Sequence, residues 1–185
     1  MAAICVFCAS SEGIDEAYLS LATDVGARIG KGGHSLVSGG GRVSMMGAVA
    51  AAARASGAHT LGVIPQHLVP LEVADTDADE LVVVDTMRQR KAVMDERSAA
   101  FLVLPGGIGT LEEFFEVWTA GSLGMHRKPV VVLDLDGFYE PLWTFIASLV
   151  ERRFVREAAW TNLHRVTSLD EAFAVIEAAV VEAVL

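Results

Sequence analysis

The sequence predicts one α/β domain with a doubly wound, mainly parallel sheet flanked by helices. Short apolar runs alternate with segments of helical spacing along the whole chain. Most of these runs are continuously apolar, which is typical of parallel strands covered on both faces. With 185 residues, 52% of them hydrophobic, the chain is long enough for one well-buried core and too short for two typical domains. We therefore treat residues 1–185 as a single domain.

The first half of the chain contains four expected strands. Glycines from Gly30 onward end the first helix, Gly57 ends the second, and Thr86 is a candidate N-cap for the third. The aperiodic stretch 66–80 contains Pro and Asp, and a loop of about 15 residues is long enough to suggest a function. The expected strands are residues 3–9, 35–38, 60–64 and 81–84, and the expected helices are residues 15–29, 45–56 and 86–97.

The second half continues the same alternation. A buried strand precedes a turn at Pro105, and helical spacing follows from Thr110. Ser168 and Glu171 form a capping-box pattern that predicts the start of a C-terminal helix. Strands are expected at residues 99–104, 128–133 and 163–166, and a further amphipathic helix at residues 138–153. Because strands and helices alternate without repeats or linkers, right-handed crossovers are expected.

Composition limits the partners and the compartment. The 24 acidic and 14 basic residues give a formal charge of −10, which opposes broad association with nucleic acid or an anionic membrane. The amino terminus has neither the basic region nor the apolar core of a signal peptide, and no apolar stretch approaches the roughly 20 residues of a membrane span. We expect a cytoplasmic protein without nucleic-acid or membrane partners.

The cysteines and histidines do not indicate a metal site. Cys5 and Cys8 fall on an expected strand, where successive side chains alternate between faces, so we expect core residues rather than a redox or metal pair. The five histidines show no paired spacing.

The stretch Pro105–Glu113 is a strand-to-helix turn with three glycines. Glycines let the backbone approach a ligand closely, and the helix that follows directs its positive dipole end to the same place. Loops after two other strands, at Ser10–Ser11 and Gly39–Gly41, are expected to gather with it at the carboxyl ends of the strands. Further ligand contacts are therefore expected at Ser10, Gly40, Gly41 and Gly106.

Neither glycine turn has the dinucleotide pattern. In the G-x-G-x-x-G frame, the third glycine is replaced by Ser44 when the count starts at Gly39, and by Glu112 when it starts at Gly107. The sequence also lacks G-x-x-x-x-G-K-[ST], which disfavours a P-loop NTPase. No cofactor is expected.

Glu112 and Glu113 allow two interpretations. Thr110 and Glu113 have the spacing of a capping box, which would satisfy amides at the helix end without any chemistry. Alternatively, a carboxylate held beside a bound sugar phosphate could stabilise an oxocarbenium-like transition state or activate water. The position of Glu113 near the start of a helix, beside amides available to phosphate, favours the second interpretation.

A cluster of cations lies at the start of the helix after residue 86. Arg88, Arg90 and Lys91 occupy its first two turns, where the helix dipole disfavours positive charge by about 0.3–1 kcal/mol each. A solvated basic face remains an alternative. In an acidic chain, however, such a cluster favours an anion site, with Arg90 as a bidentate donor and Lys91 as a point charge.

These two motifs together resemble the LONELY GUY (LOG) family, cytokinin riboside 5'-monophosphate phosphoribohydrolases once widely mislabelled lysine decarboxylases. The family hallmark P-G-G-x-G-T-x-x-E is complete at Pro105–Glu113, and M-x-x-R-K is complete at Met87–Lys91. The opening run Ile4–Ser11 and the turn Ser38–Gly41 are also similar, so the resemblance spans nearly the whole chain.

The resemblance implies a Rossmann-like fold without a dinucleotide, a homodimer, and hydrolysis of the N-glycosidic bond of an N6-modified AMP to the free base and ribose 5-phosphate. Arg90 and Glu113 are the implied catalytic pair. The implied substrate contacts are Glu72, Lys91, Gly107, Ile108, Gly109, Thr110, Leu111, Glu112 and Thr119.

Three positions in two motifs depart from the family pattern. The usual M-H-E-R-K has Arg88 and Gln89 in its middle positions, and Ser44 stands about where the family has a glycine. Both departures bear on base selectivity and phosphate-loop geometry, and neither removes a catalytic position. Two alternatives remain open, namely a broader phosphoribohydrolase acting on AMP and other purine nucleotides, and a non-catalytic protein that binds a nucleotide or the molybdenum cofactor.

Overall fold

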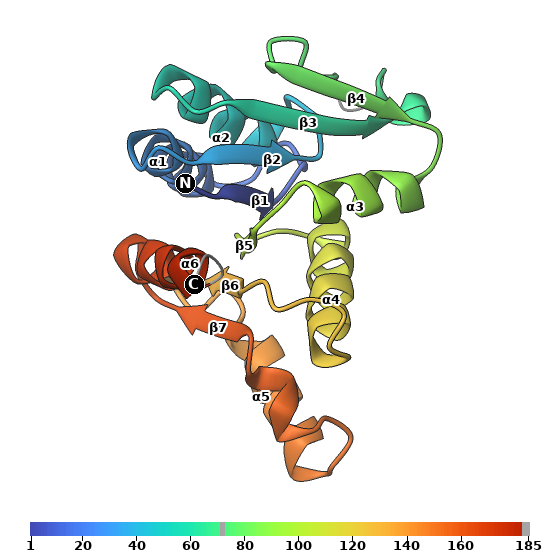
Figure 1. The fold of residues 1–185 in the computed structure, drawn as a ribbon, viewed down its shortest axis with the longest axis vertical. Coiled ribbons are helices and arrows are strands. Elements are labelled where there is room, and N and C mark those ends of the chain that lie inside the picture. The colour runs from blue at the N-terminus through green and yellow to red at the C-terminus, as the bar shows by residue number, and fades with distance from the viewer. Residues whose placement is uncertain (71–72, 183–185) are drawn as a thin grey trace.

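The computed structural model describes residues 1–70 and 73–182, and over these residues seven parallel strands form one sheet with helices on both faces (Figure 1). The strand order is β4-β3-β2-β1-β5-β6-β7. The strands are β1 (Ala3–Phe7), β2 (Ser35–Ser38), β3 (Thr60–Pro65), β4 (Glu80–Val84), β5 (Ala100–Val103), β6 (Val130–Leu133) and β7 (Leu163–Val166). The helices are α1 (Glu16–Lys31), α2 (Ser44–Ala55), α3 (Met87–Glu96), α4 (Ile108–Ser122), α5 (Glu140–Glu151) and α6 (Leu169–Glu182), with short 3-10 helices η1 (Gln66–Leu68) and η2 (Glu157–Trp160). The predicted doubly wound α/β class is confirmed.

The strand order reverses between β1 and β5, and this switch point positions the site. The chain runs outward from β1 to β4 and then returns to the other side of β1, so the carboxyl ends of β1 and β5 are neighbours. The N–H of Leu104 donates to the Phe7 carbonyl over 2.9 Å, and the N–H of Ala9 donates to the Pro105 carbonyl over 3.2 Å. The loop at Ser10 and the turn at Pro105 therefore leave the sheet side by side, as expected of such folds.

Two apolar layers enclose the sheet. Helices α1, α2 and α6 pack on one face, with Phe173 completely buried, and α3, α4 and α5 pack on the other, with Phe114 almost completely buried (Figure 1). Burying each such phenylalanine stabilises the fold by about 1.5–3 kcal/mol. Cys8 lies in the first layer and Cys5 in the second, which confirms that they are core residues on opposite faces of the sheet.

The starts of α3 and α4 test two capping signals in the sequence. Thr86 caps α3 as predicted, because its hydroxyl accepts from the N–H of Gln89 while the Gln89 side chain accepts from the N–H of Thr86. The structure does not support the alternative interpretation of Thr110 and Glu113 as a capping box. Helix α4 begins earlier, at Ile108, with Gly107 as an N-cap that supplies no side chain.

Residues 73–75, in the stretch expected to form a loop, are anchored to the glycine turn. The stretch begins with η1, its Ala74 forms a bridge with Gly41, and the N–H of Asp75 donates to the Gly40 carbonyl over 2.8 Å. Asp75 is 2% exposed and pairs with Arg54 of α2 at 2.7 Å.

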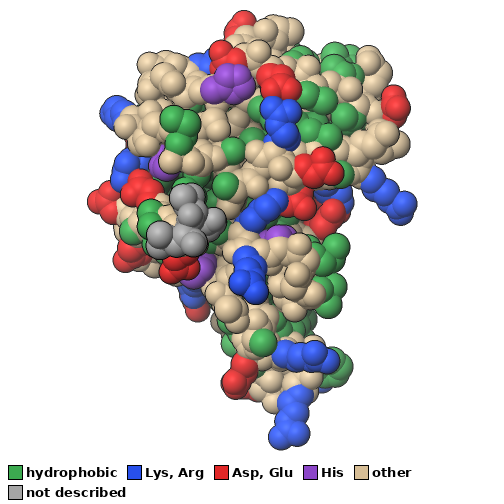
Figure 2. Space-filling model, in the orientation of Figure 1, with side chains coloured by type: hydrophobic (Ala, Val, Ile, Leu, Met, Phe, Trp, Pro, Cys, Tyr) green, Lys and Arg blue, Asp and Glu red, His purple; other side chains and the backbone are tan. Residues whose placement is uncertain are grey.

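Acidic and basic side chains are interspersed over the face shown in Figure 2. None of the described helices is both long and apolar enough to span a membrane.

Candidate active site

Arg90 is the buried cation of the site. Arg90 is 5% exposed. Its guanidinium donates through Nε to the Val63 carbonyl and through Nη2 to the Gly39 carbonyl, both over 3.1 Å. A Cβ at Gly39 would lie 1.7 Å from Nη2, so the close approach of the guanidinium requires glycine at this position. With Nε and Nη2 engaged, Nη1 lies 3.5 Å from Oε1 of Glu113.

Glu113 places a negative charge beside this cation. Its side chain is 11% exposed and projects from α4, six residues after the N-cap Gly107. The charge also reaches β1, where burial raises the pKa of the Cys5 and Cys8 thiols and the Glu113 carboxylate raises it further. Both thiols are therefore held in the neutral form at physiological pH.

A small polar pocket lies over the start of α4. The amides of a helix's first turn have no partners within the helix, and here no side chain caps them. Gly106 is required just before them, because a Cβ there would lie 2.1 Å from Oγ1 of Thr110. The pocket has a volume of about 210 Å³ and is lined by Cys8, Ser10, Ser11, Met46, Leu68, Met87, Arg90, Gly107, Ile108, Gly109, Thr110, Glu112 and Glu113. Helix amides, two serines and an arginine are the groups that bind an anion such as phosphate.

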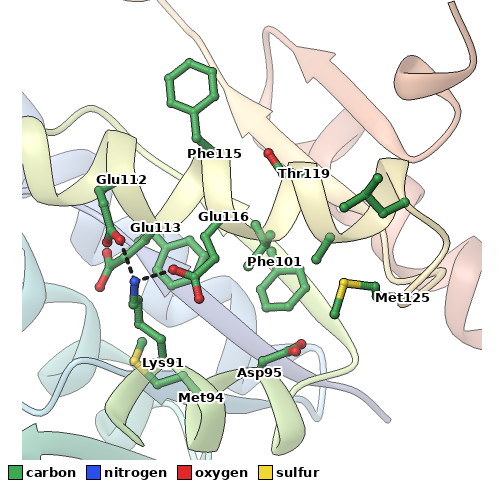
Figure 3. Close-up of a pocket in the computed structure, with 14 residues that line it drawn as sticks. Lys91, Met94, Asp95, Phe101, Glu112, Glu113, Phe115, Glu116, Thr119 and Met125 are labelled. Carbon is green, nitrogen blue, oxygen red and sulfur yellow. Dashed lines mark hydrogen bonds and ion pairs between the residues drawn. The ribbon is translucent and has the colours of Figure 1, made fainter. Parts of the chain in front are cut away.

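Lys91 is held by carboxylates of α4. Its ammonium donates to both Glu112 and Glu116, as Figure 3 shows. Burial favours the neutral amine, but the hydrogen bonds that the ammonium donates to the two carboxylates outweigh this effect and raise the pKa of Lys91. The ion pairs therefore fasten α3 to α4 across the site.

A larger and mostly apolar pocket opens on the far side of Glu112 and Glu113 (Figure 3). It has a volume of about 520 Å³ and is lined by Phe7, Lys91, Met94, Asp95, Phe101, Glu112, Glu113, Phe115, Glu116, Val117, Thr119, Ala120, Leu123 and Met125. The two pockets share Glu112 and Glu113, so the carboxylates stand between the small polar pocket and the larger apolar one.

The structure brings most of the expected residues together. Ser10, Arg90, Gly107, Ile108, Gly109, Thr110, Glu112 and Glu113 line the small pocket, and Lys91 and Thr119 line the larger one. Gly40 and Gly41 are buried behind the site, where they hold the stretch 73–75. Gly106 and Leu111 are half-buried and support the turn without lining either pocket. Glu72 lies outside the described residues.

Two features of the site differ from what the sequence indicated. Arg88 is exposed and lines neither pocket, so the basic cluster is divided between solvent and the site. The second partner of Lys91, Glu116, was not predicted. It follows Glu112 by four residues, which places both side chains on one face of a helix, and that spacing could have indicated a shared partner. Within the described residues, no group of three or more His, Cys, Asp or Glu side chains is placed to hold a metal ion.

Comparison with known proteins assigns the family. Residues 46–178 match the family described as "Possible lysine decarboxylase". A cytokinin riboside 5'-monophosphate phosphoribohydrolase of Mycobacterium tuberculosis is 50% identical over 169 residues, which cover 91% of this chain and 90% of the relative. The chain belongs to the LOG family. The cytokinin riboside 5'-monophosphate phosphoribohydrolase LOG2 of Arabidopsis thaliana is 44% identical over 156 residues, which cover 84% of this chain and 73% of that relative.

Solved structures similar to this LOG protein show its fold in more distant proteins. The Moco carrier protein from Chlamydomonas reinhardtii matches with a TM-score of 0.73 and 20% identity, over 97% of this chain and 98% of that one. The molybdenum cofactor binding protein from Rippkaea orientalis matches with a TM-score of 0.71 and 21% identity, over 96% of each chain. At this level of identity, the similarity concerns the fold alone.

Proposed function

We propose that this LOG protein hydrolyses the N-glycosidic bond of N6-modified AMP, a cytokinin riboside 5'-monophosphate, to the free base and ribose 5-phosphate. The observation that carries the proposal is the position of Glu113, which is paired with Arg90 and lines both the small polar pocket and the larger apolar pocket. Relatives that carry this activity in their names are 44–50% identical over most of the chain.

The 5'-phosphate belongs in the small pocket. Uncapped amides at the start of α4 and the hydroxyls of Ser10 and Ser11 can donate to its oxygens, and the helix dipole favours its charge. The Arg90 guanidinium, already bonded to two carbonyls, adds positive charge at the back of the pocket.

The base belongs in the larger pocket. A ribose whose phosphate sits at the start of α4 would carry its base past Glu113 into the space bounded by Met94, Phe101 and Phe115. Apolar walls suit an aromatic base with an apolar N6 substituent, because burying its surface removes it from water. Lys91 keeps Glu112 and Glu116 at the entrance to this space.

The chemistry then falls to Glu113. As the bond between C1' and the base breaks, positive charge develops on the ribose, and a fixed carboxylate stabilises it. Water supplies a hydroxyl to C1', and its proton goes to the departing base. Arg90 orients the carboxylate through Nη1 while its own position is fixed by Val63 and Gly39.

The direct test is hydrolysis of N6-isopentenyl-AMP, in which chromatography monitors the release of both free base and ribose 5-phosphate. AMP is the comparison substrate. Faster turnover of the prenylated nucleotide supports the proposal, whereas equal or faster turnover of AMP supports the broader purine-nucleotide alternative. A protein that retains a nucleotide through purification and releases no base from either substrate would act as a carrier, and the proposal would be wrong.

We also propose a homodimer that works in the cytoplasm. Hydrophobic side chains gather along the α4 edge in Figure 2, and Leu123 and Met125 at the end of that helix are 72% and 75% exposed. Apolar surface of this kind is what a second copy would cover. Light scattering after size exclusion tests the dimer, and a monomer at micromolar concentration would contradict it.

The proposed location in the cytoplasm fits the two cysteines, because buried thiols without a disulfide suit a reducing compartment.

A further inference from the structure

Tyr139 lies directly behind the glycine-rich turn, at the residue that precedes α5. It is 4% exposed, and its hydroxyl donates a hydrogen bond to the Leu104 carbonyl over 2.8 Å. Burial raises the pKa of Tyr139, and a hydrogen bond from the backbone of Gly106 to the same hydroxyl opposes that rise. One phenol therefore connects the residues on either side of Pro105.

A second set of contacts fixes Tyr139 itself. Its N–H donates to Oδ1 of Asp134 over 3.1 Å, and Oδ2 of Asp134 accepts from Arg165 over 2.9 Å. Asp134 is 1% exposed, so its charge depends on these partners. The tyrosine ring packs in the apolar layer that contains Phe114 and Trp143. Contacts at the end of β6, on β7 and at the start of α5 thus fix the position of the hydroxyl, and all of them lie outside the turn that it contacts.

The opposite side of the turn faces the small pocket and has few restraints. Gly107 and Gly109 are exposed, and a Cβ at either position would find no atom within 4 Å. On the sheet side, the hydrogen bond from Ala9 ties Pro105 to the end of β1. Tyr139 adds the restraint that comes from the far half of the sheet.

We propose that Tyr139 is a positioning residue for the phosphate-binding turn. Its hydroxyl holds the backbone at Leu104 and Gly106, and so sets where the first amides of α4 and Glu113 meet the nucleotide. The inference rests on the proposed function. Without the hydroxyl, the Leu104 carbonyl loses a buried partner, and the turn shifts to recover one. A displacement of about 1 Å at a reacting site can cost about a hundredfold in rate.

Tyr139→Phe isolates the hydroxyl because it keeps the ring. The chain's other tyrosine provides the matched control Tyr18→Phe, since Tyr18 is half-buried on α1, packs edge-on against Phe138 and lines neither pocket of the site. We expect Tyr139→Phe to weaken binding of ribose 5-phosphate, measured by calorimetry, about tenfold, as for the loss of one buried hydrogen bond. With N6-isopentenyl-AMP, KM should rise more than kcat falls. Tyr18→Phe should change neither.

The binding and turnover measurements separate this inference from the proposed function. Wild-type affinity and KM in Tyr139→Phe, whatever its melting temperature, would overturn the inference, and so would a wild-type protein that does not bind ribose 5-phosphate. A wild-type protein that binds ribose 5-phosphate but releases no base overturns the proposed function only, and the affinity of Tyr139→Phe still decides the inference. If Tyr139→Phe does not fold, Arg165→Lys loosens Asp134 while keeping a cation beside it. This variant should weaken binding about threefold, and an unchanged affinity would overturn the inference.

Discussion

Nη1 of Arg90 lies 3.5 Å from Oε1 of Glu113, and the two side chains are 7% and 11% exposed. Because neither charge is well solvated, each depends on the other and on fixed neighbours. Arg90 has such neighbours in the Val63 and Gly39 carbonyls, so it holds its place without a ligand. Glu113 faces both pockets and is the member of the pair that a ribose would meet.

Glu113→Gln should abolish turnover while preserving the fold. The amide keeps the shape of the side chain but removes the charge that stabilises the ribosyl cation, a loss of about a hundredfold or more in kcat. Base release from N6-isopentenyl-AMP measures it. Glu96→Gln, at the exposed end of α3, is the matched control and should retain full activity. Activity of Glu113→Gln within tenfold of wild type would remove Glu113 from the mechanism.

Arg90→Met should reduce both activity and stability. It leaves the Val63 and Gly39 carbonyls without their donor and Glu113 without its counter-charge, and breaking a buried pair in this way costs about 3–5 kcal/mol. The midpoint of urea unfolding should fall accordingly. Arg88→Met, exposed on the same helix, should change the free energy of unfolding by no more than about 0.5 kcal/mol. Equal effects of the two substitutions would contradict the structural account of Arg90.

Ser44→Gly should stabilise the protein. Ser44 has a φ of 50°, in the left-handed region that costs a non-glycine residue about 1–2 kcal/mol. Its hydroxyl is also buried without a partner among the described residues. Glycine loses more conformational entropy on folding than serine, which offsets part of this gain. We expect the free energy of unfolding, measured by heat or urea, to rise by about 1 kcal/mol. Ser20→Gly, in the exposed interior of α1, should instead lose about 1 kcal/mol. A destabilised Ser44→Gly would show that the serine side chain has a role at this turn.

The two thiols should be unreactive in the native protein. Burial raises the pKa of Cys5 and Cys8, so the thiolate that attacks disulfide reagents is scarce near neutral pH, even though Cys8 borders the small pocket. Ellman's reagent at pH 7.5 should therefore detect no rapidly reacting thiol in native protein and two after denaturation. Cys5→Ser provides the control, with one thiol after denaturation. Rapid labelling of the native protein would contradict this expectation.

The Lys91 ion pairs should stabilise the fold at neutral pH and weaken only in strong alkali. The pKa of Lys91 is raised above its usual 10.5, so the contribution is complete below that value and is lost as the pH rises through the folded-state pKa. The difference in unfolding free energy between wild type and Lys91→Met should be constant from pH 7 to 9 and shrink above pH 10.5. Urea titrations at pH 7, 9 and 11 measure it. A difference that already falls between pH 7 and 9 would be inconsistent with the raised pKa.

The sequence by itself determined the features that depend on near neighbours. Apolar runs predicted the seven strands, Thr86 predicted the start of α3, and the glycines after Pro105 predicted a strand-to-helix turn. Each of these signals is carried by residues a few positions apart. Thr110 and Glu113 do not form a capping box, because the N-cap of α4 is Gly107, three residues before Thr110.

Only the tertiary structure decided which side chains meet across the switch point. The carbonyls that hold Arg90 lie 27 and 51 residues before it, on β3 and after β2, and no local pattern connects them. Tyr139 reaches the turn from 35 residues beyond Leu104. These contacts depend on the order of the strands, because the crossover connections bring distant segments together only after the sheet has formed.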